Sequence, residues 1–169
     1  MNRMILHCGD GRGKSSSAIG VATRALAHGK KVLAVQFFKP ESDSALLFLQ
    51  KNAADMLTVR NYGSWYFVNK PDEHARELYQ NALNEIKKLI VDEKFDVILL
   101  DEIFYTVQFG ILNVSEILEI TEAFDNKCFI MTGRNAPDEL VEMADTVSKI
   151  ECVKHAFEQG IKAQCGIEY

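Results

Sequence analysis

The chain has 169 residues, and its 19 basic and 24 acidic side chains leave a formal net charge of −5. Apolar residues make up 47% and charged residues 25%, which is ordinary for a globular protein with one sizeable core. This acidic balance offers no electrostatic footprint for nucleic-acid backbones. General nucleic-acid binding is therefore not expected. The overall charge does not exclude a local basic patch.

The cysteines and the apolar runs indicate in which cellular compartment the protein is expected. None of Cys8, Cys128, Cys152 and Cys165 belongs to a Cys-x-x-Cys pair, so no zinc or redox motif is expected. Small buried cysteines are typical of a reducing compartment. The apolar run Met4–Cys8 is too short for a signal peptide, and no run approaches the length of a membrane span. We therefore expect a cytoplasmic protein without membrane contact.

Short apolar runs alternate with helical patterns along the chain. The predicted strands are, in chain order, Met4–His7, Val32–Phe37, Leu57–Arg60, Val97–Leu100, Cys128–Thr132 and Thr146–Ile150. The predicted helices are Ser16–Ala27, Ser44–Gln50, Asp72–Lys94, Ser115–Phe124 with Ser115 as its cap, and Pro137–Ala144. Strand–helix alternation predicts an α/β fold with a mainly parallel sheet. No linker or repeat interrupts it, so we expect one domain over residues 1–169.

The strongest motif is the glycine-rich segment Gly9-Asp10-Gly11-Arg12-Gly13-Lys14-Ser15, whose last three residues form a Walker A ending. It follows a predicted strand and opens a predicted helix, as phosphate binding at a helix N-terminus requires. In this motif Lys14 bridges the outer phosphates and the Ser15 hydroxyl binds magnesium. One departure is that Cys8 stands where the strict pattern has glycine.

The second motif is an apolar strand that ends in two acids, Asp101 and Glu102, and resembles a Walker B element. Open parallel sheets bind ligands at the carboxyl ends of their strands, so these acids are expected to meet the magnesium held by Ser15. The two motifs predict a P-loop NTPase-like (RecA-like) three-layer fold that holds ATP or GTP. They do not say what happens to the nucleotide.

Beyond the P-loop, the chain resembles the ATP:corrinoid adenosyltransferases of the CobA/BtuR/CobO type. The matching segments are Gly9–Ser15, Arg24–Ala25, His28–Val32, Val35–Lys39, Leu100–Glu102, Thr132–Arg134, Ala144–Val147, Val153–Phe157, Gly160–Gln164 and Gly166–Tyr169. They are distributed over most of the length. The tail segments are the most specific, because generic P-loop proteins do not carry them.

The resemblance implies a reaction in which the Co(I) of a reduced corrinoid attacks the 5′ carbon of ATP and inorganic triphosphate leaves. It implies Lys14, Ser15 and Glu102 as catalytic residues, and Ser15, Glu102 and Asp101 around magnesium. The implied ATP-binding residues are Gly9, Asp10, Gly11, Arg12, Gly13, Lys14, Ser15, Ser16 and Arg24. For Arg24, an ordinary place on a helix surface is the alternative.

On the corrinoid side, Trp65 and Phe67 fall where the family keeps two aromatic residues. The family usually has phenylalanine first and tryptophan second, and this chain has the reverse order. The sequence therefore does not determine which class of lower cobalt ligand the enzyme accepts. The alternative role for these two aromatic residues is ordinary packing within a loop. The resemblance also implies a homodimer and an electron donor such as a flavoprotein. The competing functions are a generic P-loop ATPase or small-molecule kinase, and a non-enzymatic, ATP-dependent corrinoid carrier.

Overall fold

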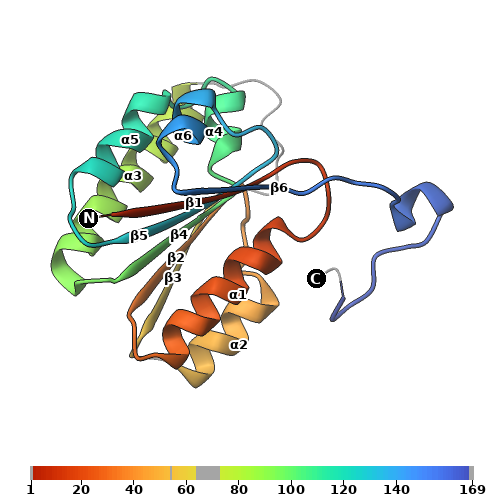
Figure 1. Ribbon diagram of the computed structural model, residues 1–169, viewed down its shortest axis with the longest axis horizontal. Coiled ribbons are helices and arrows are strands. Elements are labelled where there is room, and N and C mark those ends of the chain that lie inside the picture. Colours follow the sequence, from red (N-terminus) through yellow and green to blue (C-terminus); the bar gives the residue numbers. More distant parts are fainter. Residues whose placement is uncertain (1, 54, 64–72, 168–169) are drawn as a thin grey trace.

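The computed structural model describes residues 2–53, 55–63 and 73–167, and a single six-stranded sheet lies at its centre (Figure 1). Every pairing in the sheet is parallel, with the order β3-β2-β4-β5-β1-β6. The strands are β1 (Arg3–Cys8), β2 (Val32–Phe37), β3 (Leu57–Tyr62), β4 (Val97–Asp101), β5 (Cys128–Thr132) and β6 (Thr146–Lys149). β5 therefore separates β1 from β4.

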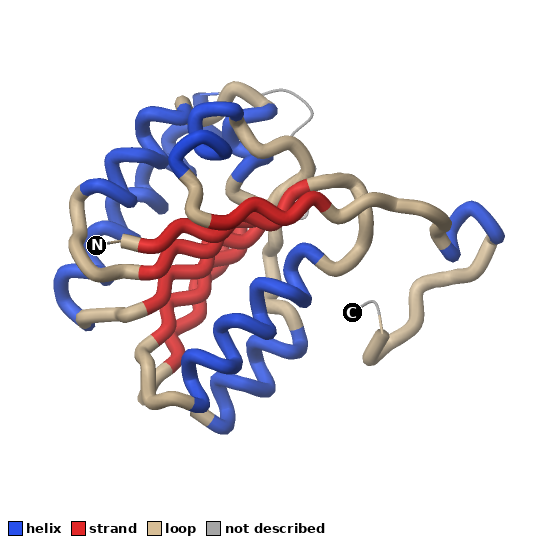
Figure 2. Tube along the Cα trace, in the orientation of Figure 1, coloured by secondary structure: helices blue, strands red, loops and turns tan. Residues whose placement is uncertain are grey.

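Helices cover both faces of the sheet and make three layers, with α1 and α2 on one side and α3 to α6 on the other (Figure 2). They are α1 (Lys14–Ala27), α2 (Ser44–Asn52), α3 (Glu73–Glu93), α4 (Phe104–Gln108), α5 (Val114–Glu122) and α6 (Asp138–Met143). The tail carries one 3-10 turn, Ala156–Gln159. The predicted P-loop NTPase-like α/β fold is thus confirmed, with a sheet that is parallel throughout.

The central strands are buried on both faces, which explains their continuous apolar sequences. All residues of β2 and β4 are buried. One core joins the sheet to α3, α5 and α6, and the other joins it to α1 and α2. In the second core, Ala18 and Ala22 of α1 are fully buried, and their small side chains let the helix lie close to the strands.

Two local features differ from the sequence-based expectation. The short helix α4 directly after β4 was not predicted, because five residues are too few to show helical periodicity. The helix predicted over Ser115–Phe124 begins at Val114, and Asn113 takes the cap position assigned to Ser115. The Glu116 carboxylate accepts a hydrogen bond from the Asn113 backbone N–H at 2.8 Å, which is half of a capping box.

Polar side chains interrupt the apolar strands at one level of the sheet, near the carboxyl ends. In the strand register Gln36 pairs with Asp101, and His7 pairs with Thr132. All four of these side chains are buried. Because the P-loop follows β1 and the acids end β4, this buried polar row lies directly beneath the functional motifs.

Truncating the core should destabilise the protein far more than truncating the surface of the same helix. Ile86 of α3 is fully buried, whereas Val91 is 63% exposed. Ile86→Ala should lower the free energy of unfolding by about 2–5 kcal/mol, and Val91→Ala should change it by less than about 0.5 kcal/mol. Urea unfolding followed by circular dichroism measures both. Equal losses in the two variants would contradict the assigned helix face.

Candidate functional site

The glycine-rich loop connects the end of β1 to the start of α1, as the motif requires. Gly13 is the N-cap residue of α1 and has φ +115°, a conformation that side chains other than glycine rarely adopt. No side chain of the described residues caps this helix, and its first turn holds no acidic residue. The N–H groups and the positive end of the dipole at the start of α1 are therefore available to an anion.

Gly9 and Gly11 are required by the chain that leaves β6. A Cβ atom on Gly9 would collide with the carbonyl oxygen of Ile150, and one on Gly11 would lie 2.7 Å from the Glu151 carbonyl. Backbone hydrogen bonds fix the crossing, since the Gly11 N–H donates to the Ile150 carbonyl at 2.9 Å. This crossing explains the departure in the motif, because glycine is needed at positions 9 and 11 while Cys8 still belongs to the buried strand.

Asp101 is a buried carboxylate, 1% exposed, that is surrounded by donors. One oxygen accepts from Lys39 Nζ at 2.8 Å and from Gln36 Nε2 at 3.1 Å, and the other accepts from Thr132 Oγ1 at 2.7 Å. Burial by itself would raise the pKa of Asp101. The Lys39 ammonium and the hydrogen bonds from Lys39, Thr132 and Ser15 outweigh burial and hold this pKa below its usual value. Asp101 is therefore a fixed negative charge.

Glu102 is placed under opposite conditions. Its backbone has φ +63°, in the left-handed region, and its Oε2 atom is buried without a hydrogen-bond partner among the described residues. Burial and the neighbouring charge of Asp101 raise its pKa, against the opposing fields of Lys39, Lys14 and Arg134. Strained backbone and an unsatisfied buried carboxylate are features that point to a functional role.

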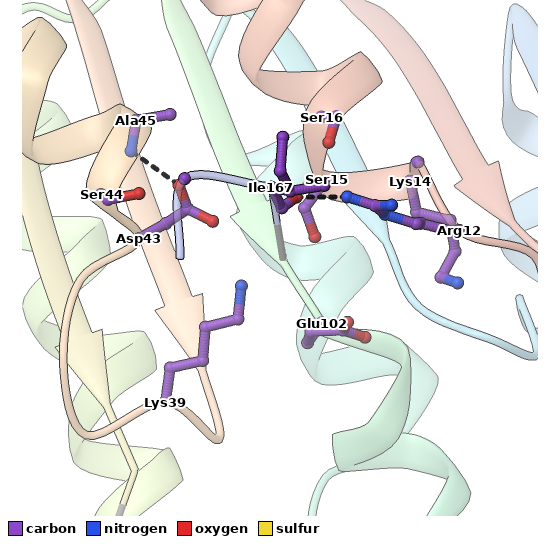
Figure 3. Close-up of a pocket in the computed structure, with 12 residues that line it drawn as sticks. Arg12, Lys14, Ser15, Ser16, Lys39, Asp43, Ser44, Ala45, Glu102 and Ile167 are labelled. Atoms are coloured by element: carbon purple, nitrogen blue, oxygen red, sulfur yellow. Dashed lines mark hydrogen bonds between the residues drawn. The ribbon is translucent and has the colours of Figure 1, made fainter. Parts of the chain in front are cut away.

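The loop, Glu102 and the start of α2 line one pocket of about 360 Å³ (Figure 3), and the buried Asp101 is not among its walls. Its walls are Arg12–Ser16, Lys39, Asp43–Ala45, Glu102 and Gly166–Ile167. Lys14 Nζ donates to the Gly11 carbonyl at 2.8 Å, so its ammonium lies at the loop. The structure brings together, around this one pocket, Arg12, Gly13, Lys14, Ser15, Ser16 and Glu102.

The C-terminal tail also reaches this pocket. After β6 the chain extends away from the sheet and then returns towards the start of α1 (Figure 1). The Arg12 guanidinium donates a hydrogen bond to the Ile167 carbonyl, which is drawn in Figure 3. Gly166 and Ile167 consequently form part of the pocket wall. The specific tail sequence therefore has a structural place beside the P-loop.

The remaining predicted residues are placed elsewhere or lie outside the described residues. Asp10 belongs to the loop and accepts from the Cys152 backbone N–H at 3.3 Å. Arg24 is exposed in the last turn of α1, about 15 Å along the helix from Lys14, and is not among the pocket walls. Trp65 and Phe67 fall in the undescribed segment 64–72.

Several polar residues of the site had no predicted role. Among them are Lys39, Thr132 and Asp43, although Thr132 is the last residue of a predicted strand and Lys39 stands two residues after another. That position was the available signal, because the carboxyl ends of parallel strands converge at one edge of the sheet. Asp43 lies in a segment whose sequence gave only weak element signals; its carboxylate accepts from the Ala45 N–H at 2.9 Å and caps α2.

A parallel α/β sheet, a glycine-rich loop that opens an uncapped helix, and acids at the end of a nearby strand together define a P-loop nucleotide-binding protein. The sequence profile of the family described as ATP:corrinoid adenosyltransferase BtuR/CobO/CobP matches residues 1–169. The chain therefore belongs to the ATP:corrinoid adenosyltransferase family. It is a transferase that moves the adenosyl group of ATP to a corrinoid.

Individual relatives agree with the family. The corrinoid adenosyltransferase of Escherichia coli (strain K12) is 37% identical over an alignment 172 residues long. The alignment covers 98% of this chain and 85% of the relative. Corrinoid adenosyltransferase CobA of Salmonella typhimurium is 33% identical with the same coverage. The corrinoid adenosyltransferase of Pseudomonas aeruginosa is 32% identical over 98% of this chain and 83% of its own length.

A methyl group should be harmful at Gly11 and harmless at Gly20. Gly11→Ala forces the backbone at Glu151 to move and should lower both stability and nucleotide affinity. Gly20 lies in α1 with open space around its Cβ position, so Gly20→Ala should raise stability by about 0.5–1 kcal/mol through helix propensity. Thermal unfolding and ATP titration of both variants check this. A Gly11→Ala protein that binds ATP normally would contradict the close crossing.

Proposed function

We propose that this enzyme transfers the 5′-deoxyadenosyl group of ATP to the Co(I) centre of a reduced corrinoid and releases inorganic triphosphate. The observation that carries the proposal is the uncapped N-terminus of α1, with Lys14 and Glu102 in one pocket, in a chain of this family. Such a pocket suits the triphosphate, which is the leaving group of this transfer. The same chemistry explains why no protein nucleophile is required.

The triphosphate would be held mainly from the P-loop side. The N–H groups at the start of α1 and the Lys14 ammonium are positive groups that face one pocket. Lys14 would exchange its hydrogen bond with the Gly11 carbonyl for phosphate oxygens, which requires only side-chain rotation. Arg12 and Ser16 also line the pocket and would add donors at its rim. Gly9, Asp10 and Gly11 would shape the loop and not contact the phosphates through side chains.

The oxygen donors of the site fit magnesium. The described residues hold no group of three or more His, Cys, Asp or Glu side chains that would bind a metal by themselves. Magnesium commonly takes one or two carboxylates and completes its shell with waters and substrate phosphates. Glu102 and the Ser15 hydroxyl would hold it, and Asp101 would orient Ser15 through their hydrogen bond. When bound, it would neutralise charge on the triphosphate.

The transfer itself needs little from the protein beyond binding and charge. As the cobalt–carbon bond forms, the bond from C5′ to the first phosphate oxygen breaks, and its electron pair remains on the triphosphate. The two electrons of the new bond come from Co(I). Lys14 and the α1 N–H groups would stabilise the negative charge that develops on the departing oxygen, since they are fixed before the reaction starts.

The corrinoid would bind beyond the acids. Trp65 and Phe67 keep their predicted role on that side. The described residues contain a separate cluster of aromatic rings, with Tyr105 and Phe109 stacked at 5.6 Å and Phe38 edge-on to both at 6.0 and 5.7 Å. Burial and, after it, the charge of Glu102 raise the pKa of Tyr105, so the Tyr105 hydroxyl lies within reach of the field of Glu102.

Several further expectations belong to the same proposal. We expect a homodimer, an electron donor such as a flavoprotein to reduce the corrinoid, and a single domain over residues 1–169. A cytoplasmic location is proposed from the four cysteines, all free thiols. Within the described part of the chain, no helix is both long and apolar enough to cross a membrane. Arg24, exposed on α1, remains a candidate for nucleotide contact.

The decisive test combines the purified enzyme with magnesium, ATP and a chemically reduced corrinoid. A light-sensitive adenosylated corrinoid should form with an equal amount of triphosphate, followed by absorbance and by phosphate analysis. Lys14→Ala should reduce the rate by about a hundredfold or more, because a main cation on the leaving group is lost. Orthophosphate without change at cobalt would indicate an ATPase or kinase, and ATP-dependent corrinoid binding without a cobalt–carbon bond would indicate a carrier.

Glu102→Gln should raise the stability of the free protein and remove its response to magnesium. The amide removes the repulsion from Asp101 and the unsatisfied buried charge. In the absence of magnesium the variant should therefore melt about 2–4 °C higher than the wild type, as expected for a gain of about 1 kcal/mol. It should also lose the additional thermal stabilisation that magnesium gives in the presence of ATP. A variant that melts lower, or that still responds fully to magnesium, would remove Glu102 from the metal site.

A further inference from the structure

The wall opposite the P-loop contains a further cation, Lys39, besides the Arg12 and Lys14 of the loop side. Lys39 follows the end of β2, and its side chain extends from that wall into the pocket, towards the side that holds Ser15 and Glu102 (Figure 3). It is 30% exposed, so it keeps access to the pocket while its ammonium contacts the buried Asp101 at 2.8 Å. Asp43 to Ala45, at the start of α2, continue the same wall.

Lys39 can leave Asp101 without leaving that carboxylate unsatisfied. Asp101 also accepts from Gln36 and from Thr132, so both of its oxygens keep a partner when Lys39 turns away. Ser15 adds a further hydrogen bond. A lysine that served only to neutralise Asp101 would not need an open path to the pocket. The observed arrangement therefore suits an ammonium that is shared between Asp101 and a pocket anion.

A departing triphosphate would be stabilised by an ammonium on the wall opposite the P-loop. It carries negative charge along its whole length, whereas the P-loop and Lys14 lie along one wall of the pocket. We propose that Lys39 binds the leaving triphosphate directly from the opposite wall. When the C5′–oxygen bond breaks and its electron pair stays on the triphosphate, the Lys39 ammonium stabilises that charge and remains protonated throughout. This inference rests on the proposed triphosphate site.

The test is the affinity for inorganic triphosphate, measured by calorimetry in EDTA so that no metal takes part. Lys39→Met alone would leave Asp101 with an uncompensated charge that repels any anion, so the comparison is made in an Asp101→Asn background. Asp101→Asn and Lys39→Met/Asp101→Asn differ only in the lysine. We expect the double variant to bind triphosphate about tenfold or more weakly than Asp101→Asn, because a charge-assisted contact is lost.

Two matched variants complete the experiment. Lys39→Arg in the same background should restore most of the affinity, since it keeps the charge on that wall. Lys51→Met, an exposed lysine in the last turn of α2, should leave the affinity unchanged and controls for overall charge. Melting temperatures of all variants report whether the fold is retained.

The outcomes separate this inference from the proposed function. If Asp101→Asn and the double variant bind triphosphate equally, Lys39 acts only on Asp101 and the inference is wrong, while the triphosphate site stands. If the wild-type protein binds no triphosphate under any condition, the proposed site fails and the inference fails with it. A loss confined to the double variant, and rescued by arginine, supports direct contact.

Discussion

The buried charge of Asp101 is the constraint on which the site depends. An ionised carboxylate in a protein core is tolerated only when it is paired and hydrogen-bonded. Here the partners come from two neighbouring strands and from the segment after β2: Gln36 from β2, Thr132 from β5, and Lys39. Thr132 also accepts from the Glu102 backbone N–H at 2.8 Å, so the same network holds the strained residue that follows. Loss of register in the sheet would break these contacts together.

The second constraint is the crossing of two chain segments beside the phosphate loop. Gly9 and Gly11 let the backbone that leaves β6 pass against the loop, and the loop in turn hydrogen-bonds to that backbone. The tail that starts at this crossing returns to the pocket, where Arg12 holds Ile167. The loop geometry and the tail are therefore coupled through a few backbone atoms.

Much of this structure could be predicted from the sequence. All six strands were expected from short apolar or β-branched runs between helical patterns, and the fully buried strands β2 and β4 gave the clearest such runs. The P-loop was recognised from the order of glycines, lysine and serine. What could not be predicted depends on contacts between distant positions. Lys39 is one surface-type residue among many until the sheet order brings it to Asp101, 62 residues away. Helix α4 is set by packing at the end of β4, not by its own periodicity.

The two acids at the end of β4 have opposite electrostatic environments, which lower the pKa of Asp101 and raise the pKa of Glu102. Asp101 is satisfied by protein donors, so it remains charged whether or not a ligand is present. Glu102 lacks such donors, and its raised pKa and left-handed backbone mean that the free protein is destabilised at this residue. A cation with phosphate bound beside it would relieve that destabilisation. The unfavourable placement of Glu102 would thus increase the affinity for the cation, because the bound cation supplies the positive partner that the protein does not provide.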